Sequence, residues 1–229
     1  MSSIKLKHSG GNSVSLNPPT SAPTSSEVAF KLPTADGTAG QVLQTDGSGN
    51  LSWVSLPTAG IQMVDIWDLN HVAQGNAGVE IELGKTSGYN GGIGVWTRAN
   101  DYNGTIGSAM SVSNEVFTFP STGIYQIDFQ LQTWNQSNVQ NNYIFARIVA
   151  TTNGGTNWYQ RSTDTSNAIA NSSTVYSHNR ATYIFDVTDT STHKVKFIKQ
   201  SAQIATVNGD ASADSHLYTY VIFKRLGDT

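Results

Sequence analysis

The sequence predicts an all-β protein in which an extended N-terminal stem, residues 1–57, precedes a β-sandwich formed by residues 60–229. Three observations support this prediction. Strand-like alternation of apolar and polar residues recurs in the second part, as expected for strands that bury one face. No stretch of about 11 or more residues has the 3.6-residue periodicity of an amphipathic helix. The first part is rich in turn-forming residues and contains no apolar run long enough to build a core.

The first 57 residues carry their apolar side chains in small groups separated by Pro, Gly, Ser and Asp. Such groups cannot bury one another within a single chain. The stretch Asn17–Pro23 favours an extended, polyproline-like backbone, because proline fixes its own φ and disfavours helix in the residue before it. We therefore expect this segment to become ordered against a partner surface.

Six segments of the second part alternate apolar and polar residues. The clearest has Tyr125, Ile127, Phe129 and Leu131 interleaved with polar residues. The other alternating sets are Val79, Ile81 and Leu83; Ile144, Ala146 and Ile148; Tyr183, Phe185 and Val187; Val195 and Phe197; and Leu217, Thr219, Val221 and Phe223. Turn formers such as Asn153–Gly155 and Asn208–Asp210 lie between them and readily supply the positive φ of tight hairpins. Many short strands with polar loops are typical of a β-sandwich.

The composition indicates a polar surface that carries little charge. Charged residues make up 13% of the chain, against about 25% in an average globular protein. The chain has 13 Lys and Arg and a net charge of −3, so no basic face suits a phosphate backbone and we expect no nucleic-acid partner. It contains no cysteine, which excludes disulfides and makes oligomerisation the expected source of robustness.

The N-terminal sequence MSSIKLKHSGGNSVSL has no apolar segment of the signal-peptide type. No later window approaches about 18 consecutive apolar residues. We therefore expect neither a secretion signal nor membrane insertion. A protein released by lysis of its host and a cytosolic protein would both fit these absences.

Residues 31–53, KLPTADGTAGQVLQTDGSGNLSW, consist of turn dipeptides (Asp36-Gly37 and Asp46-Gly47) set between short apolar groups. This run resembles a short module in the fibres and other virion structural proteins of marine bacteriophages, cyanophage-like ones included, where it commonly precedes a β-rich head domain. The resemblance implies a virion location. It also implies that the N-terminal segment contacts other virion proteins.

The run Phe117–Phe129, FTFPSTGIYQIDF, is similar to the strand–turn–strand core of C1q/TNF-like jelly rolls. Three further segments agree with that family in order and spacing: Met63–Leu69, Ile106–Met110 and Tyr218–Leu226. Domains of this family are usually trimers, so the resemblance implies a homotrimeric jelly-roll β-sandwich over roughly residues 61–226. The Gly-rich insert Gly84–Gly94 departs from the family pattern, so binding specificity need not follow that of relatives.

The two resemblances imply a trimeric phage fibre, either a tail fibre or a tail-associated adhesin, whose C-terminal domain contacts a glycan or protein of the host surface. A capsid-attached head fibre or decoration protein is an alternative that the sequence does not separate from it. A glycan-cleaving spike is a third alternative, which would need an acidic pair drawn from carboxylates such as Asp65, Asp68, Asp101 and Asp128. We expect binding rather than catalysis, because neither a G-x-S-x-G elbow nor a cysteine nucleophile occurs.

Other chemistry-bearing residues have simpler interpretations, and we expect no catalytic residue, metal site or cofactor. Gly84-Lys85-Thr86 matches the end of a phosphate-binding loop, but Val79 stands where that motif requires Gly. The histidines lie far apart in the sequence and form no metal-binding pair; they are His8, His71, His178, His193 and His216. The oxygen-rich segment Asn208–Asp214 is interpreted as a turn rather than a cation site.

Four aromatic residues outside the alternating core positions are the candidate binding residues. Trp158 and Tyr159 follow the Asn153–Gly155 turn. Tyr89 lies in the Gly-rich insert, and Trp96 follows it. Exposed aromatic rings on polar loops can stack on sugar faces or fill a protein pocket. The alternative for all four is packing in the core or between subunits.

Overall fold

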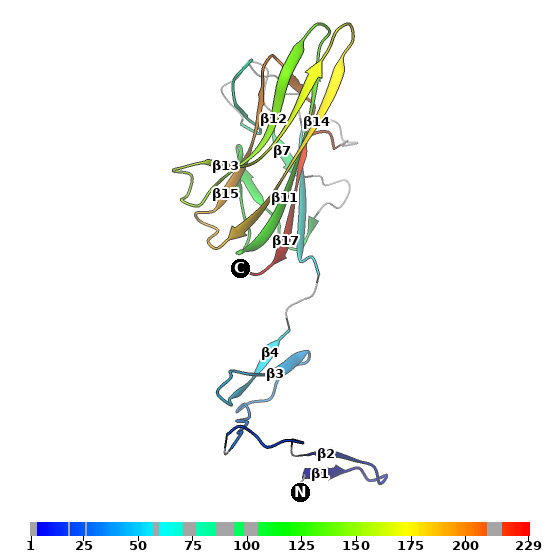
Figure 1. Cartoon of the computed structure of the whole chain (residues 1–229), viewed down its shortest axis with the longest axis vertical. Helices are drawn as coiled ribbons and strands as arrows, with labels where there is room; N and C mark the ends of the chain where they lie inside the picture. The colour runs from blue at the N-terminus through cyan, green and yellow to red at the C-terminus, as the bar shows by residue number, and fades with distance from the viewer. Residues whose placement is uncertain are drawn as a thin grey trace. The chain divides into compact units, whose positions relative to one another are not determined.

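The computed structural model describes residues 4–17, 19–25, 27–56, 60–70, 77–85, 94–98, 105–209 and 217–229. The chain divides into two compact units, Met1–Thr58 and Ala59–Thr229, which we call the N-terminal and C-terminal units (Figure 1). All regular elements within the described ranges are strands, as predicted. Those ranges therefore contain no helix that could cross a membrane.

The N-terminal unit contains two separate antiparallel hairpins. The first pairs β1 (Ile4–Lys7) with β2 (Ser13–Leu16), and the second pairs β3 (Gln41–Thr45) with β4 (Leu51–Ser55). The register of the first hairpin places its four apolar side chains on one face, and these are 65–72% exposed. They are Ile4, Leu6, Val14 and Leu16. A lone two-stranded hairpin is marginally stable in water.

The second hairpin is held by side-chain contacts that explain its turn-rich sequence. Asp46 Oδ1 accepts hydrogen bonds from the backbone N–H groups of Ser48 at 2.8 Å and Asn50 at 3.1 Å. Trp53 donates its indole N–H to the carbonyl oxygen of Ala35 at 2.9 Å. The indole lies so close to Gly37 that a Cβ atom there would approach Trp53 Cδ2 to 2.6 Å. Glycine at position 37 therefore leaves the space that the indole occupies.

The C-terminal unit consists of two antiparallel sheets (Figure 1). The seven-stranded sheet has the order β14-β11-β17-β5-β7, with β8 also pairing with β5 and β16 with β11. Its strands are β5 (Met63–Leu69), β7 (Trp96–Arg98), β8 (Thr105–Ile106), β11 (Gly123–Asn135), β14 (Val175–Val187), β16 (Thr206–Val207) and β17 (Tyr220–Gly227). The six-stranded sheet has the order β13-β12-β15-β10-β9, with β6 also pairing with β15. Its strands are β6 (Ile81–Glu82), β9 (Ser111–Ser113), β10 (Val116–Thr118), β12 (Gln140–Thr151), β13 (Tyr159–Ile169) and β15 (Lys194–Ser201).

The core lies between the two sheets and is centred on aromatic rings. Phe117 of β10 has its ring centroid within 5.1–5.7 Å of the rings of Trp67, Trp96, Phe197 and Phe223. The predicted alternation of the central strand is confirmed, because the residues Tyr125, Ile127, Phe129 and Leu131 are all fully buried. Edge-to-face and tilted ring pairs of this kind add stability beyond their buried area.

The predicted strand over Val79–Leu83 is shorter than expected. The strand β6 covers Ile81–Glu82, and Val79 is 41% exposed. The reason is that β6 pairs only with Ile198 and Lys199 of β15. Val79 therefore lies outside the pairing, whereas Ile81 and Leu83 are buried as predicted.

Candidate functional site

A groove of about 320 Å³ lies on the outer face of the six-stranded sheet. Arg147 and Val149 of β12 pair with Ile198 and Lys196 of β15, and all four line the groove. Between them in register, Ile148 and Phe197 point into the core and are fully buried. Strand alternation therefore directs the four groove residues to the outer face. Glu80, Glu82, Trp158 and Gln160 complete the lining.

The charges of the groove are paired with one another. Lys196 and Arg147 form ion pairs with Glu82 and Glu80, respectively. Lys85, beside the groove, adds a second contact to Glu82 at 2.6 Å. Burial acts to raise the pKa of Glu82, but its hydrogen bonds and charge interactions with Lys196 and Lys85 outweigh burial and lower the pKa below its usual value. The carboxylate is therefore ionised at neutral pH and available as a hydrogen-bond acceptor.

Trp158 forms one wall of the groove and is half-buried. The ammonium nitrogen of Lys196 lies 4.4 Å from the centroid of its ring, a cation–π contact. The β12–β13 turn positions the indole: Asn157 N donates to Asn153 Oδ1 at 3.0 Å. Gly155 has a positive φ of +99°, which favours glycine in this turn, and it lies beside the ring. The predicted Asn153–Gly155 turn is thus present and fixes the tryptophan.

Tyr159, which was predicted to be a binding residue together with the adjacent Trp158, does not line the groove. Trp158 and Gln160 face the groove, and the residue between them points to the other side of the chain because side chains alternate along an extended strand. Tyr159 is 51% exposed. The guanidinium of Arg161 lies 5.2 Å from its ring. The two adjacent aromatics therefore do not form one binding surface.

The prediction that Trp96 presents an exposed ring is wrong. Trp96 is 2% exposed, and its ring packs against Phe117 and Phe197 at 5.7 and 5.6 Å. Its indole N–H donates to the carbonyl oxygen of Leu83 at 2.8 Å. Gly84 (φ +91°) permits this close approach, because a Cβ there would collide with the indole at 2.2 Å. Tyr89, the remaining candidate, lies outside the described residues.

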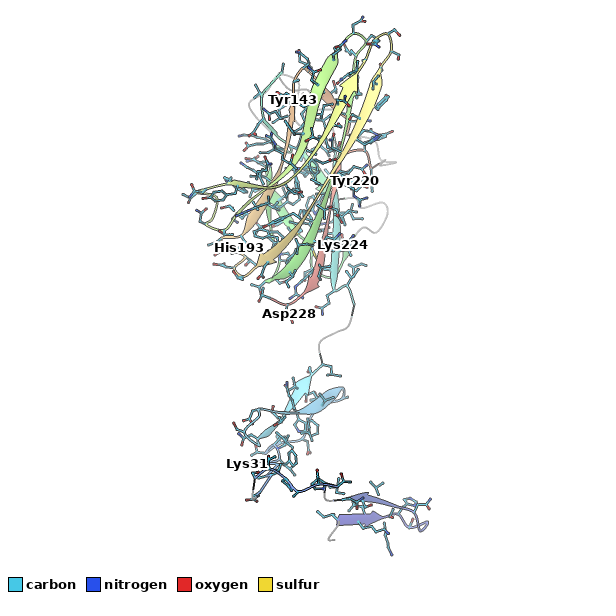
Figure 2. The ribbon with its side chains drawn as sticks, in the orientation of Figure 1. Lys31, Tyr143, His193, Tyr220, Lys224 and Asp228 are labelled. Carbon is cyan, nitrogen blue, oxygen red and sulfur yellow. The ribbon has the colours of Figure 1, made fainter. Side chains whose placement is uncertain are left out.

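Two aromatic residues that sequence reasoning missed lie on the same outer face. Tyr143 and Phe145 of β12 alternate with buried Ile144 and Ala146, and are half-buried with ring centroids 5.0 Å apart. The guanidinium of Arg147 lies 4.4 Å from the ring of Phe145, which links this pair to the groove. Figure 2 places Tyr143 at the end of the C-terminal unit opposite Asp228. The available signal was two aromatic residues at successive outward positions, Tyr143 and Phe145, of a strand whose alternate positions Ile144, Ala146 and Ile148 are aliphatic.

The carboxylates considered for an acidic pair have internal partners. Asp128 accepts hydrogen bonds from Thr182 and Gln126 at 2.8 Å and from Lys224 at 3.2 Å. Burial acts to raise its pKa, and these partners outweigh burial and lower it. Asp65 is fully buried, and Asp68 accepts a hydrogen bond from Thr97 at 2.9 Å. Asp101 lies outside the described residues.

Within the described ranges, no three His, Cys, Asp or Glu side chains come close enough together to hold a metal ion. His8, His178 and His193 are described, whereas His71 and His216 are not. The segment 210–216, which includes most of the oxygen-rich turn, also lies outside the described residues. The groove beside Trp158 combines an aromatic ring with ion-paired side chains on adjacent strands, and these side chains are suited to binding rather than to covalent chemistry.

The comparison with solved structures bears on the C-terminal unit. Eiger TNF from S. frugiperda has a TM-score of 0.50 with 8% sequence identity, covering 72% of this chain and 93% of that chain. The C-terminal unit is a TNF-like jelly roll. Murine APRIL at pH 5.0 has a TM-score of 0.47 with 10% identity, covering 72% of this chain and 98% of that chain. No protein-family model and no curated protein sequence matches the chain.

The eight main strands of the TNF-like jelly roll form two four-stranded layers, β14-β11-β17-β5 and β13-β12-β15-β10. This agrees with the double-sheet architecture of jelly rolls. The groove and the Tyr143–Phe145 pair occupy the outer face of the second layer. The outer face of the first layer is a separate surface of the jelly roll.

Proposed function

We propose that this chain is a structural protein of a bacteriophage particle, that it forms a homotrimeric fibre, and that its C-terminal unit contacts the host surface. The observation that carries the proposal is the exposed apolar surface of the N-terminal unit. The similarity of residues 31–53 to a virion module and the TNF-like jelly roll of the C-terminal unit add support.

The N-terminal unit exposes many of its apolar side chains, and clustered exposed apolar groups mark interaction sites. Of the 21 large hydrophobic side chains that are exposed in the described residues, 11 lie between residues 4 and 56. They include the hairpin face of β1 and β2, where Leu6 and Val14 are 68% and 72% exposed. Other copies of the chain and a socket on the virion are the partners that would cover these groups, because each small hairpin lacks a core of its own.

The outer face of the β14-β11-β17-β5 layer is suited to packing around a threefold axis. Ile66 of β5 and Ile222 of β17 are direct cross-strand partners on this face, and both are half-buried. Ile184 of β14 is 51% exposed on the same face. The central charge, Asp128, is neutralised by Lys224 at 3.2 Å. These isoleucines lie among polar side chains of β11, such as Gln126 and Gln130, and a face of mixed side chains with internally paired charge suits an interface between identical subunits.

Within this proposal, a tail fibre or tail-associated adhesin is preferred, because a jelly roll after an extended segment carries its loops to a host surface. A capsid-attached head fibre or decoration protein is the second candidate, and the same structural features support it. A glycan-cleaving spike receives less support, because the described candidate carboxylates Asp65, Asp68 and Asp128 are held by internal hydrogen bonds.

Light scattering on the purified chain tests the fibre proposal. A trimer would have a mass of 3 × 24.6 kDa, about 74 kDa. Immunogold labelling of the phage particles would then distinguish tail from capsid attachment. A stable monomer of 24.6 kDa, or particles without label, would contradict the proposal.

A further inference from the structure

We propose that the outer face of the six-stranded sheet binds an uncharged glycan chain laid along β12, with Tyr143 and Phe145 at one end of the track and the Trp158 groove at the other. This inference rests on the proposed function for its biological use, because it names the class of host molecule that the C-terminal unit would contact. Its structural basis is independent of the oligomeric state.

The track begins with two stacked aromatic rings on a face that no second sheet covers. The rings of Tyr143 and Phe145 lie 5.0 Å apart with an interplanar angle of 32°. Outward side chains on one strand follow one another at about 7 Å, so Tyr143, Phe145, Arg147 and Val149 form one regular row. Half-exposed aromatic rings offer apolar faces on which the C–H faces of sugar rings can stack.

Arg147 connects the aromatic pair to the groove. Its guanidinium lies 4.4 Å from the ring of Phe145 and forms an ion pair with Glu80, whose side chain is 54% exposed. The Nε atom of Arg147 is buried and has no hydrogen-bond partner among the described residues. An unpaired buried donor is costly. The side chain is held in place by its ring contact and its ion pair, so its guanidinium keeps a fixed position between the aromatic pair and the groove.

The charge pattern selects an uncharged ligand. Five ionisable groups surround the groove: Glu80, Glu82, Lys85, Arg147 and Lys196. Two acids and three bases leave a net charge of +1, and the bases are already paired with acids. An acidic polymer needs several unpaired cations, which these five groups do not supply. Sugar hydroxyl groups both donate and accept hydrogen bonds, so they match a surface on which carboxylates, a guanidinium and the Gln160 amide alternate.

The narrowness of the row favours a glycan over a protein partner. The neighbouring strand β13 presents small polar residues beside the row, namely Thr163 and Thr165, which pair with Arg147 and Phe145 and are exposed. A protein interface typically has a broad apolar centre with a polar rim. A narrow row that starts with two aromatic rings and is bordered on its β13 side by hydroxyl groups instead fits an extended chain of hydroxylated rings.

The test is binding of the full chain to an array of neutral and acidic oligosaccharides and bacterial polysaccharides. We expect neutral glycans to bind, with an affinity that changes little between low and high salt. The Tyr143→Ala and Phe145→Ala variants should each lose about tenfold in affinity, and Trp158→Ala a similar factor. Tyr159→Ala is the matched control, because Tyr159 is 51% exposed on the same sheet but does not line the groove.

Circular dichroism and light scattering on each variant separate lost binding from lost folding. If an aromatic-to-alanine variant fails to fold, Thr165→Arg, which places a long side chain across the row from an exposed position, gives the same test. The inference is overturned if no neutral glycan binds, if only acidic polymers or proteins bind, or if the control weakens binding as much as the row variants. A trimer on virions that binds no glycan would refute this inference alone. A glycan-binding monomer would refute the fibre proposal and leave this inference standing.

Discussion

The guanidinium Nε of Arg98 donates a hydrogen bond of 3.0 Å to Oδ1 of Asp65, whose carboxylate is fully buried. The same carboxylate accepts hydrogen bonds from Trp67 Nε1 at 2.9 Å, Thr105 Oγ1 at 3.2 Å and Met110 N at 2.7 Å. Arg98 also donates to the carbonyl oxygen of Met110 at 2.8 Å. These contacts fasten β7, β8 and the segment before β9 to β5.

We expect Asp65→Asn to destabilise the C-terminal unit by about 3 kcal/mol, because removing one partner of a buried, hydrogen-bonded charge pair leaves donors unsatisfied. Urea unfolding at fixed protein concentration measures the change. Asp228→Asn is the control: Asp228 pairs with Arg225 but its side chain is 81% exposed, so the loss should be below about 1 kcal/mol. Equal losses in the two variants would show that the Asp65 network contributes little.

Lys199 is a buried cation whose ionisation opposes folding. Its side chain is fully buried and donates to the carbonyl oxygen of Ala205 at 2.9 Å. Burial lowers its pKa from 10.5 to about 8. Between these two pH values the unfolded chain binds more protons than the folded chain, so stability rises with pH across this window by about 3 kcal/mol and is flat below pH 8.

Lys199→Met should therefore raise the melting temperature at pH 7 and remove the rise in stability between pH 8 and 10.5. Lys194→Met, a half-buried position on the same strand, should retain the rise. Thermal unfolding at several pH values compares the three proteins. A Lys199→Met variant that is less stable than the parent at pH 7 would contradict a net cost of the buried charge.

Gly37→Ala should loosen the second hairpin of the N-terminal unit. The added Cβ would come within 2.6 Å of Trp53 Cδ2, so the indole must move and lose its hydrogen bond to Ala35. Hydrogen exchange followed by mass spectrometry should show faster exchange across β3 and β4. Ser52→Ala, on an exposed position of β4, should leave exchange unchanged. Unchanged exchange in Gly37→Ala would mean that the indole does not support the hairpin.

Ile222→Glu tests the face that we assign to the trimer interface. Ile222 is paired with Ile66 on the outer face of β17, and strand alternation puts Tyr220 and Lys224, labelled in Figure 2, on the same face. Burying a carboxylate between subunits is costly, so we expect the mass to fall from about 74 kDa, or 3 × 24.6 kDa, to 24.6 kDa in light scattering. Thr165→Glu, on the outer face of the other sheet, should remain trimeric. The reverse pattern would place the interface on the six-stranded sheet.

The strand pattern of the C-terminal unit could be predicted from the sequence because alternation is a local property. The buried face of the central strand could be identified without knowledge of distant residues. Apolar side chains at every second position indicate that one face of the strand is buried, and on this strand they are Tyr125, Ile127, Phe129 and Leu131. The Asn153–Gly155 turn could be predicted for the same reason, because its backbone conformation depends on the residues within it.

The surroundings of single aromatic residues depended on the tertiary structure. Trp96 looks like a loop residue in the sequence, but Gly84 and the rings of Phe117 and Phe197, which are distant in the chain, enclose it. Trp158 meets Lys196 only because β12 lies between β13 and β15. The sequence by itself determined which residues alternate and where the chain turns. Tertiary structure alone decided which outward faces gather rings and charges, because that depends on the pairing of strands far apart in the chain.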